Sequence, residues 1–238
     1  HERLLMRKIA HGTRNARVGP AMTLDQAQAA IRAGMEIGQS LPGNVLACAG
    51  LGVGSHESAA LVLSRLTGAP VRELLLSHPQ MDTSLLTHLL AVTQSAQARH
   101  RDTADPVEVL AALGGFDVAM MAGAMLVSAG RRHLIMVDGL PACAAVMVAS
   151  RIAAPVIDYC VFCRSHGHQG LDYALNLFHS SALLELGMSS TDGTGATLAW
   201  PLVRAAASLL TEVAEGEELS TSLPQELDAG DTVREIEL

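Results

Sequence analysis

Asp192 stands directly before a glycine-containing turn, Gly193 to Gly195, and its carboxylate could take a proton in an acid–base reaction. A helix is predicted to begin near Thr194, so its first backbone N–H groups would face this turn and could bind an anion such as phosphate. Helix capping is the ordinary use of Asp at such a position. The spacing therefore leaves two interpretations of Asp192 open, a catalytic base or a helix cap.

A second glycine-rich stretch follows the apolar run 44–49, which is predicted to be a strand. It contains Gly52 and Gly54, and Ser55 can cap the helix that comes next. A strand, a glycine turn and a helix N-terminus together present backbone N–H groups at the carboxyl edge of a parallel sheet. The spacing differs from the G-x-G-x-x-G nucleotide fingerprint, so the stretch alone is a weak motif.

A third stretch contains Gly114 and Gly115 between two predicted helices. Asp105 and Pro106 provide a cap and a first-turn residue for the helix before the glycines. Asp117 can cap the helix after them, whose small residues allow close packing. Glycine pairs often mark a simple corner between packed helices, and the alternative is an open elbow that contributes to a binding site.

Two further strands are predicted at 133–138 and 156–161. Asp138 ends the first of them and Gly139 follows it, at the end of the strand where open α/β sheets bind ligands. These residues are therefore candidates for the same site as the glycine turns.

Cysteine and histidine gather at the end of the strand predicted at 156–161, at positions 160, 163, 166 and 168, and both residue types bind zinc. Alternation along a strand would direct Cys160 and Cys163 to opposite faces unless the strand ends between them. Free cysteine is also common in protein cores. Core thiols are the preferred interpretation, and neither a metal nor a cofactor is predicted.

The composition limits the class of protein. Only 3% of the 238 residues are aromatic, so a core of this size must be aliphatic, which favours an α/β fold with helices packed on a buried parallel sheet. No apolar run is long enough to span a bilayer, no signal-peptide pattern opens the sequence, and no basic footprint for nucleic acid is present. Four cysteines fit a reducing compartment. A cytoplasmic protein without membrane or nucleic-acid partners is expected.

Three regions are predicted along the chain. A lead-in segment at 1–22 is followed by an α/β domain at 23–213, whose first helix starts at a capping box of Thr23 and Gln26 and runs to about residue 39. The region 214–238 contains eight acidic residues and one arginine, and it is predicted to be a disordered tail.

Five sequence blocks occur in the order and spacing of one known family: HGTRN with GPAM, GLGVG, DPVEVLAALGGFD with AMMAGAML, VDG, and GMSSTDGTGA with PL. They resemble the nicotinate-nucleotide:dimethylbenzimidazole phosphoribosyltransferases, which build the lower-ligand nucleotide of cobalamin. The third and fifth blocks are the most specific. The resemblance implies a Rossmann-like parallel sheet flanked by helices, with part of a small helical domain, and a homodimer.

The resemblance also implies a reaction between small molecules. In this family an azole nitrogen of 5,6-dimethylbenzimidazole attacks C1′ of nicotinate mononucleotide, which releases nicotinate and forms α-ribazole phosphate. Asp192 falls on the position of the family's general base, a glutamate, with a side chain one methylene shorter. The implied substrate-binding residues are Gly52, Gly54, Ser55, Gly114, Gly115, Asp138, Gly139, Arg164, His168, Gly193 and Gly195.

Several positions depart from the family pattern. Gly50 takes the place of a family glutamate, Ser55 and the two residues after it replace Asn-Thr-Thr, and the region 68–105 lacks the family's second glycine loop and lysine. The leading alternative is therefore a diverged, non-catalytic homologue that binds a nucleotide or base, or that serves as a subunit of a larger assembly. A carboxyl-terminal fragment of a longer enzyme is a third interpretation.

Overall fold

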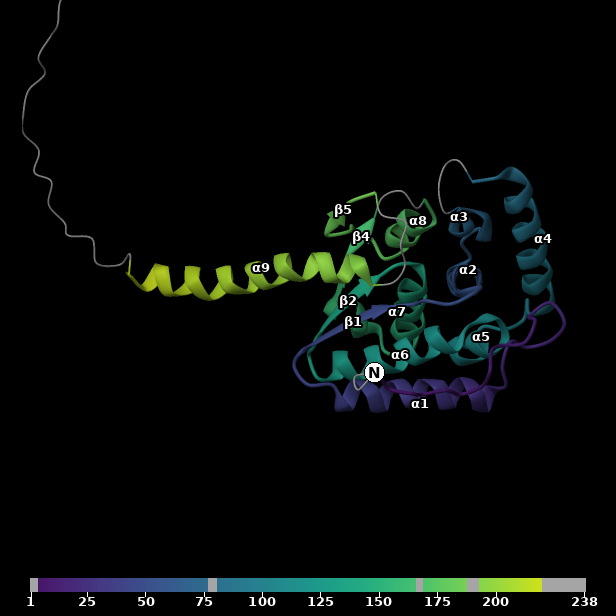
Figure 1. The fold of residues 1–238 in the computed structure, drawn as a ribbon, viewed down its shortest axis with the longest axis horizontal. Helices are drawn as coiled ribbons and strands as arrows, with labels where there is room; N and C mark the ends of the chain where they lie inside the picture. The colour runs from purple at the N-terminus through teal and green to yellow at the C-terminus, as the bar shows by residue number, and fades with distance from the viewer. Residues whose placement is uncertain (1–3, 77–80, 166–168, 188–192, 220–238) are drawn as a thin grey trace, which may run out of the picture. The chain divides into compact units, whose positions relative to one another are not determined.

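The chain folds as an α/β protein in which helices surround a small parallel sheet, which confirms the predicted fold class (Figure 1). The computed structural model describes residues 4–76, 81–165, 169–187 and 193–219. The chain divides into a main unit, residues 1–199, and a second unit, residues 200–238. All the contacts of the candidate site described below lie within the main unit.

The strands of the central sheet are parallel and lie in the order β1 (Val45–Ala49), β2 (Leu134–Asp138) and β3 (Cys160–Phe162). Ala49 pairs in register with Asp138, so the carboxyl ends of β1 and β2 are level. Two-residue strands β4 (Arg164–Ser165) and β5 (Leu184–Glu185) form a second parallel pair. The loops that leave β1 and β2 therefore start from one edge of the sheet.

The helices of the described residues are α1 (Leu24–Ser40), α2 (Ser55–Thr67), α3 (Val71–Leu75), α4 (Thr83–Arg99), α5 (Pro106–Leu113), α6 (Phe116–Gly130), α7 (Leu140–Ile152), the 3₁₀ helix η1 (Ala154–Tyr159), α8 (Gln169–Leu177) and α9 (Thr194–Leu219). Helices α6 and α7 both contact β1 and β2, and α2 packs on α7. The core that they enclose is mainly aliphatic, as the scarcity of aromatic residues predicted.

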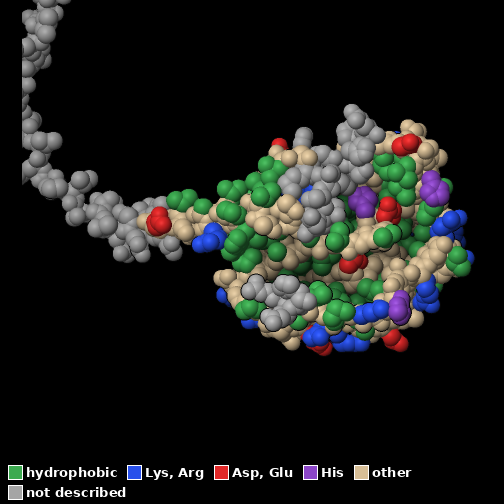
Figure 2. All heavy atoms as spheres, viewed as in Figure 1, with side chains coloured by type: hydrophobic (Ala, Val, Ile, Leu, Met, Phe, Trp, Pro, Cys, Tyr) green, Lys and Arg blue, Asp and Glu red, His purple; other side chains and the backbone are tan. Residues whose placement is uncertain are grey.

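Helices α1 and α6 lie side by side with their backbones in contact, at the bottom of the view in Figure 1. A Cβ at Gly34 of α1 would overlap the carbonyl oxygen of Met120, and one at Gly123 of α6 would overlap that of Ile31. The small residues of α6 therefore permit close packing, as predicted. Figure 2 shows charged side chains of both signs along the edge where α1 lies, so the outer side of this helix faces solvent.

Two helices begin at the predicted caps. Thr23 forms a capping box, in which its hydroxyl accepts from the N–H of Gln26 at 3.1 Å and its own N–H donates to the Gln26 side chain at 2.9 Å. Asp105 accepts from the N–H groups of Val107 and Glu108 at 2.9 and 3.1 Å. Both helix starts are thus fixed by local sequence.

Helices α2 and α6 begin differently from the prediction. Gly54 and Gly115 occupy the positions before their first residues, and neither start has a side-chain cap. Gly54 has a φ of 75°, a left-handed conformation that favours glycine. Ser55 and Asp117 already lie inside the helices, so the predictions that they act as caps are wrong.

Two predicted boundaries also differ. The strand predicted at 156–161 is mostly the helix η1, and only Cys160–Phe162 pairs with the sheet. Pro155 lies in the first turn of η1, where its fixed φ favours a helical start and its missing N–H weakens a central strand. Helix α9 continues to Leu219, beyond residue 214 where the tail was predicted to begin. Residues 220–238 lie outside the described part of the chain.

Candidate functional site

The loops that follow β1 and β2 meet at the carboxyl edge of the sheet. A Cβ at Gly50, directly after β1, would lie only 2.5 Å from Cβ of Pro141 in the first turn of α7. Gly139 joins β2 to α7 with a φ of 85°, which again favours glycine. The two loops can approach this closely because Gly50 carries no side chain.

The turn before α9 reaches the same edge. A Cβ at Gly193 would lie 3.6 Å from Cβ of Ala49, the last residue of β1. A Cβ at Gly195 would lie 2.5 Å from Cδ of Arg164 and 2.7 Å from Oδ1 of Asp138. Glycine at position 195 therefore allows the N-terminus of α9 to lie against the ends of the strands.

Asp138 is the buried centre of this edge. Its Oδ1 accepts a hydrogen bond from Nε of Arg164 at 2.6 Å, and its Oδ2 accepts one from the N–H of Ala196 in α9 at 3.0 Å. The two side chains of the ion pair are 0% and 1% exposed. Burial of two charges is tolerated where each is paired and hydrogen-bonded. Both carboxylate oxygens thus have protein partners, which favours a positioning role for Asp138 that joins β2, β4 and α9.

Asp117 and Ser55 connect the other two glycine turns. The hydroxyl of Ser55, which is buried, donates a hydrogen bond to Oδ2 of the half-buried Asp117. A Cβ at Gly50 would lie 3.3 Å from that same oxygen, and a Cβ at Gly115 would overlap Oδ1. The carboxylate of Asp117 therefore lies where the β1–α2 loop and the α5–α6 turn meet.

Gly114 has a packing role in the same turn. Its N–H donates to the carbonyl of Leu110 at 2.9 Å, and a Cβ at Gly114 would lie 2.9 Å from both that oxygen and Cδ2 of Leu110. The turn is therefore a tight corner at Gly114, and it reaches the sheet edge through Gly115. Substrate contact at Gly114 stays a prediction.

An apolar cavity of about 620 Å³ opens beside this edge, between β1, the first residues of the β1–α2 loop, α1 and α6, and we call it the β1 cavity. Its volume lies within the range of about 300–1,000 Å³ that small-molecule sites occupy. Asp117 contributes to its lining. The edge of the sheet therefore combines glycine turns, a half-buried carboxylate and an apolar hollow.

Two predicted site residues, His168 and the catalytic candidate Asp192, lie outside the described residues. Gly193, the neighbour of Asp192 in the sequence, lies against Ala49 at the end of β1. Gly52 and Gly54 belong to the β1–α2 loop, in which the N–H of Ser55 donates to the carbonyl of Gly52 at 3.3 Å. Substrate binding by each of these residues remains a prediction.

Sequence reasoning missed Asp117 as a site residue. Its partner Ser55 is 62 positions away in the chain, so the spacing around the α5–α6 turn gave only the local interpretation of a helix cap. One signal was available, because Ser55 directly follows Gly54 and Asp117 comes two residues after Gly115, in glycine turns that are expected at the same edge of the sheet.

Three of the four cysteines are buried and Cys160 is partly buried. All four are free, and β3 ends at Phe162, between Cys160 and Cys163. Burial raises the pKa of Cys160 and of Cys163 to about 12, and the nearby carboxylates of Asp158 and Asp138 add to these respective shifts. Among the described residues no group of three His, Cys, Asp or Glu could hold a metal, and the two histidines of the predicted loop lie outside them.

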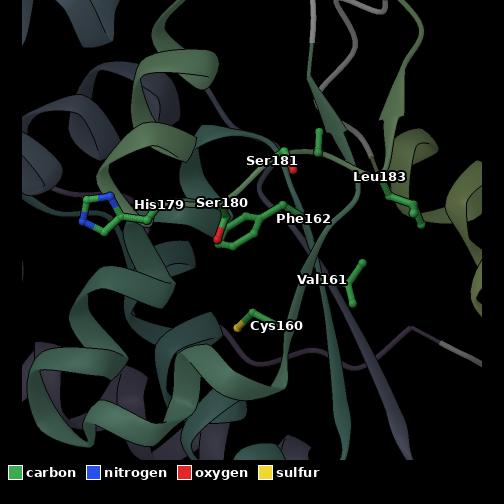
Figure 3. Close-up of a pocket in the computed structure, with 8 residues that line it drawn as sticks. Cys160, Val161, Phe162, His179, Ser180, Ser181 and Leu183 are labelled. Atoms are coloured by element: carbon green, nitrogen blue, oxygen red, sulfur yellow. The ribbon is translucent and has the colours of Figure 1, made fainter.

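A second cavity, of about 430 Å³, lies beside β3 (Figure 3). Figure 3 shows Val161 on the opposite side of the strand from Cys160, while Phe162 points toward Ser180. The segment 179–183 forms the other wall. Within the part of the chain that the structure describes, none of the glycine turns contributes to this cavity and no carboxylate lines it. Its described lining therefore lacks the glycine turns and the carboxylate that are found at the edge with Asp117.

No helix within the described residues has the length and apolar character needed to cross a bilayer.

A family profile described as "Phosphoribosyltransferase" matches residues 1–220. The nicotinate-nucleotide–dimethylbenzimidazole phosphoribosyltransferase of Cupriavidus necator is 41% identical over 222 residues, which cover 91% of this chain and 64% of the relative. The protein of the same name from Variovorax paradoxus is 37% identical over 219 residues, 92% of this chain and 63% of the relative.

The crystal structure of CobT from Thermus thermophilus superposes with a TM-score of 0.82 at 31% identity, over 89% of this chain and 64% of that one. The chain thus spans somewhat less than two thirds of the length of these relatives. The family match includes β1, β2, all three glycine turns and the start of α9. The chain therefore belongs to the nicotinate-nucleotide:dimethylbenzimidazole phosphoribosyltransferase family.

Proposed function

We propose that the chain transfers the phosphoribosyl group of nicotinate mononucleotide to 5,6-dimethylbenzimidazole or a related base, giving α-ribazole phosphate and nicotinate, in cobalamin biosynthesis. The relatives named above carry this activity in their names. The observation that carries the proposal is the meeting of the turns at Gly52–Ser55, Gly114–Gly115 and Gly193–Gly195 at the carboxyl ends of β1 and β2. Backbone N–H groups in such turns can hold a ribose phosphate.

The chemistry requires one proton acceptor. The lone pair of an azole nitrogen forms a bond to C1′ while the bond from C1′ to the nicotinate nitrogen breaks, and nicotinate leaves with that electron pair. The N–H proton of the azole then passes to a carboxylate, and we assign this role to Asp192. The position of its neighbour Gly193 against Ala49 supports the assignment. A correctly placed general base accelerates such a step by about 10²- to 10⁴-fold.

Incubation with nicotinate mononucleotide and 5,6-dimethylbenzimidazole tests the proposal directly, with nicotinate and α-ribazole phosphate measured by chromatography and mass spectrometry. Asp192→Ala should lower kcat by about 100-fold or more. Asp102→Asn is the matched control, because its side chain is 93% exposed and lies outside the site. Normal turnover in the Asp192 variant would remove this residue from its role, and absence of product with the unchanged chain would overturn the activity.

One observation favours the alternative of a protein that binds without turnover. Gly50 takes the position of a family glutamate, and the 2.5 Å approach of Pro141 leaves no room for a side chain there. A side-chain carboxylate at that position is therefore absent from this chain. Calorimetry with nicotinate mononucleotide separates the two functions, since a binder gives heat of association but releases no nicotinate.

We also assign the protein to the cytoplasm as a homodimer. Free thiols at all four cysteines support a reducing compartment. Large apolar side chains are exposed on the α9 segment of the second unit, at Trp200, Leu202, Leu209 and Leu210, and they offer a surface for self-association. Light scattering coupled to size-exclusion chromatography should give twice the mass of the chain, and a monomeric mass would contradict the homodimer.

A further inference from the structure

Among the described residues, the three glycine turns lie against different charged groups. The turn before α9 lies on the Asp138–Arg164 pair, in which the two charges neutralise each other. The turns that begin α2 and α6 lie instead on the carboxylate of Asp117. Within the described part of the chain Asp117 forms no ion pair. Like charges at short range oppose each other, so a group that binds beside Asp117 is better a hydrogen-bond donor than a phosphate.

The bond from Ser55 leaves Asp117 with capacity for further partners. A carboxylate offers about four lone-pair positions on its two oxygens, and Ser55 donates to one oxygen only. Asp117 is half-buried rather than enclosed, so a ligand can reach it. The glycines at 50 and 115 bring backbone close to both oxygens and add no side chain that would cover them.

The β1 cavity indicates what lies next to this carboxylate. Apolar side chains such as Leu46, Leu51, Met120 and Met121 line it. Among the described residues that line the cavity, Asp117 is the one with a charged side chain. An aromatic base fits the apolar wall, and a donor of hydrogen bonds fits its charged edge. A ribosyl group carries such donors in its 2′- and 3′-hydroxyls, which acidic residues at the rim of α/β sheets bind.

We propose that Asp117 is a specificity-determining residue that accepts hydrogen bonds from the ribose hydroxyls of the phosphoribosyl donor, while Ser55 holds its carboxylate in orientation. The acceptor base then lies in the β1 cavity. This assignment rests on the proposed function and deepens it. Asp192 keeps the separate role of proton acceptor.

The test compares nicotinate mononucleotide with its 2′-deoxy analogue in the unchanged chain and in Asp117→Asn. The unchanged chain should discriminate against the deoxy donor by about 10- to 100-fold in kcat/KM, the usual loss for a hydrogen bond to a charged group. Asp117→Asn should use nicotinate mononucleotide about 10- to 100-fold less well and discriminate several-fold less. Equal discrimination in both proteins overturns the proposal.

Ser55→Ala separates recognition from structural support. It removes the bond to Asp117 but keeps the carboxylate, so the preference for the ribosyl donor should persist, whereas a purely structural role for the pair predicts the same loss in both variants. Glu108→Gln, an exposed acid in the first turn of α5, is the matched control and should leave the preference unchanged.

Binding measurements keep this inference separate from the activity. Calorimetric titration with the two donors measures the same preference without any turnover. If no product forms but the preference for the ribosyl donor still depends on Asp117, the proposed reaction is wrong and the assignment of Asp117 stands. If product forms without a preference that depends on Asp117, the proposed reaction stands and the assignment of Asp117 is wrong.

Discussion

Nε of Arg164 lies 2.6 Å from Oδ1 of Asp138, and both side chains are shielded almost completely from solvent. The second oxygen of Asp138 binds the N–H of Ala196, so one carboxylate fixes the end of β2, the start of β4 and the first turn of α9. The position of the glycine turn before α9 depends on this arrangement, because Gly195 contacts both members of the pair. The pair thus links the stability of the main unit to the geometry of the site.

Arg164→Met should lower the free energy of unfolding by about 3–5 kcal/mol, because it leaves the buried carboxylate of Asp138 without its charged partner. Arg72→Ala removes an exposed ion pair with Glu73, at 3.4 Å, and should cost less than about 1 kcal/mol. Urea unfolding of both variants measures the difference. Equal, small losses would show that the buried pair contributes no more than a surface pair.

The contact between α1 and α6 should be intolerant of even one methyl group. Gly123→Ala places a Cβ against the carbonyl of Ile31, and overpacking of this kind costs about 1–3 kcal/mol or more. Gly130→Ala at the end of α6 is the matched control, because nothing lies within 4 Å of its Cβ. Thermal unfolding should separate the two variants, and a Gly123→Ala protein as stable as the control would contradict the close approach.

The thiols should react slowly in the folded protein. Burial raises the pKa of Cys48 to about 12, with nearby Cys160 and Cys163 adding to the shift, so its thiolate is scarce at pH 8. Cys160 is only partly buried and should react first. Titration with a chromogenic disulfide, with and without denaturant, should give a slow native reaction and four rapid equivalents after unfolding. Rapid reaction of all the thiols before unfolding would contradict their burial.

Local sequence signals were sufficient for strands β1 and β2, for the helix starts at Thr23 and Asp105, and for the glycine turns of the site. The caps at Thr23 and Asp105 were predictable because their partners lie two or three residues away. The strands were predictable from their short apolar runs, and the turns after them were predictable because glycine marks a change of backbone direction. These signals together placed three turns and Asp138 at one edge of the sheet.

Long-range partners were beyond the reach of the same reasoning. Asp138 and Arg164 are 26 positions apart, and Ser55 and Asp117 are 62 apart, so no spacing rule joins them. Tertiary contacts decide which polar side chains meet. Ser55 and Asp117, each expected to cap a helix, are hydrogen-bonded to each other instead. The β1 cavity was unpredicted for the same reason, since its walls come from α1, β1 and α6.

His56, in the first turn of α2 beside Ser55, should make the stability depend on pH. Burial lowers its pKa, while Glu57 and backbone hydrogen bonds at Leu74 and Leu75 oppose this shift in part. The unfolded chain takes up a proton on this residue near pH 6.5, and the folded chain does so only at lower pH. The unfolded state therefore binds more protons over this interval, and stability falls as the pH drops below about 6.5.

Urea unfolding at pH 7.5 and 5.5 measures this effect. The unchanged chain should lose stability at the lower pH, and His56→Gln should lose less because the titrating group is gone. His88→Gln, which changes an exposed histidine, should keep the original dependence. The comparison uses the difference between the two pH values within each protein, so any general destabilisation by the substitution cancels. An unaltered pH dependence in His56→Gln would show that other groups cause the loss.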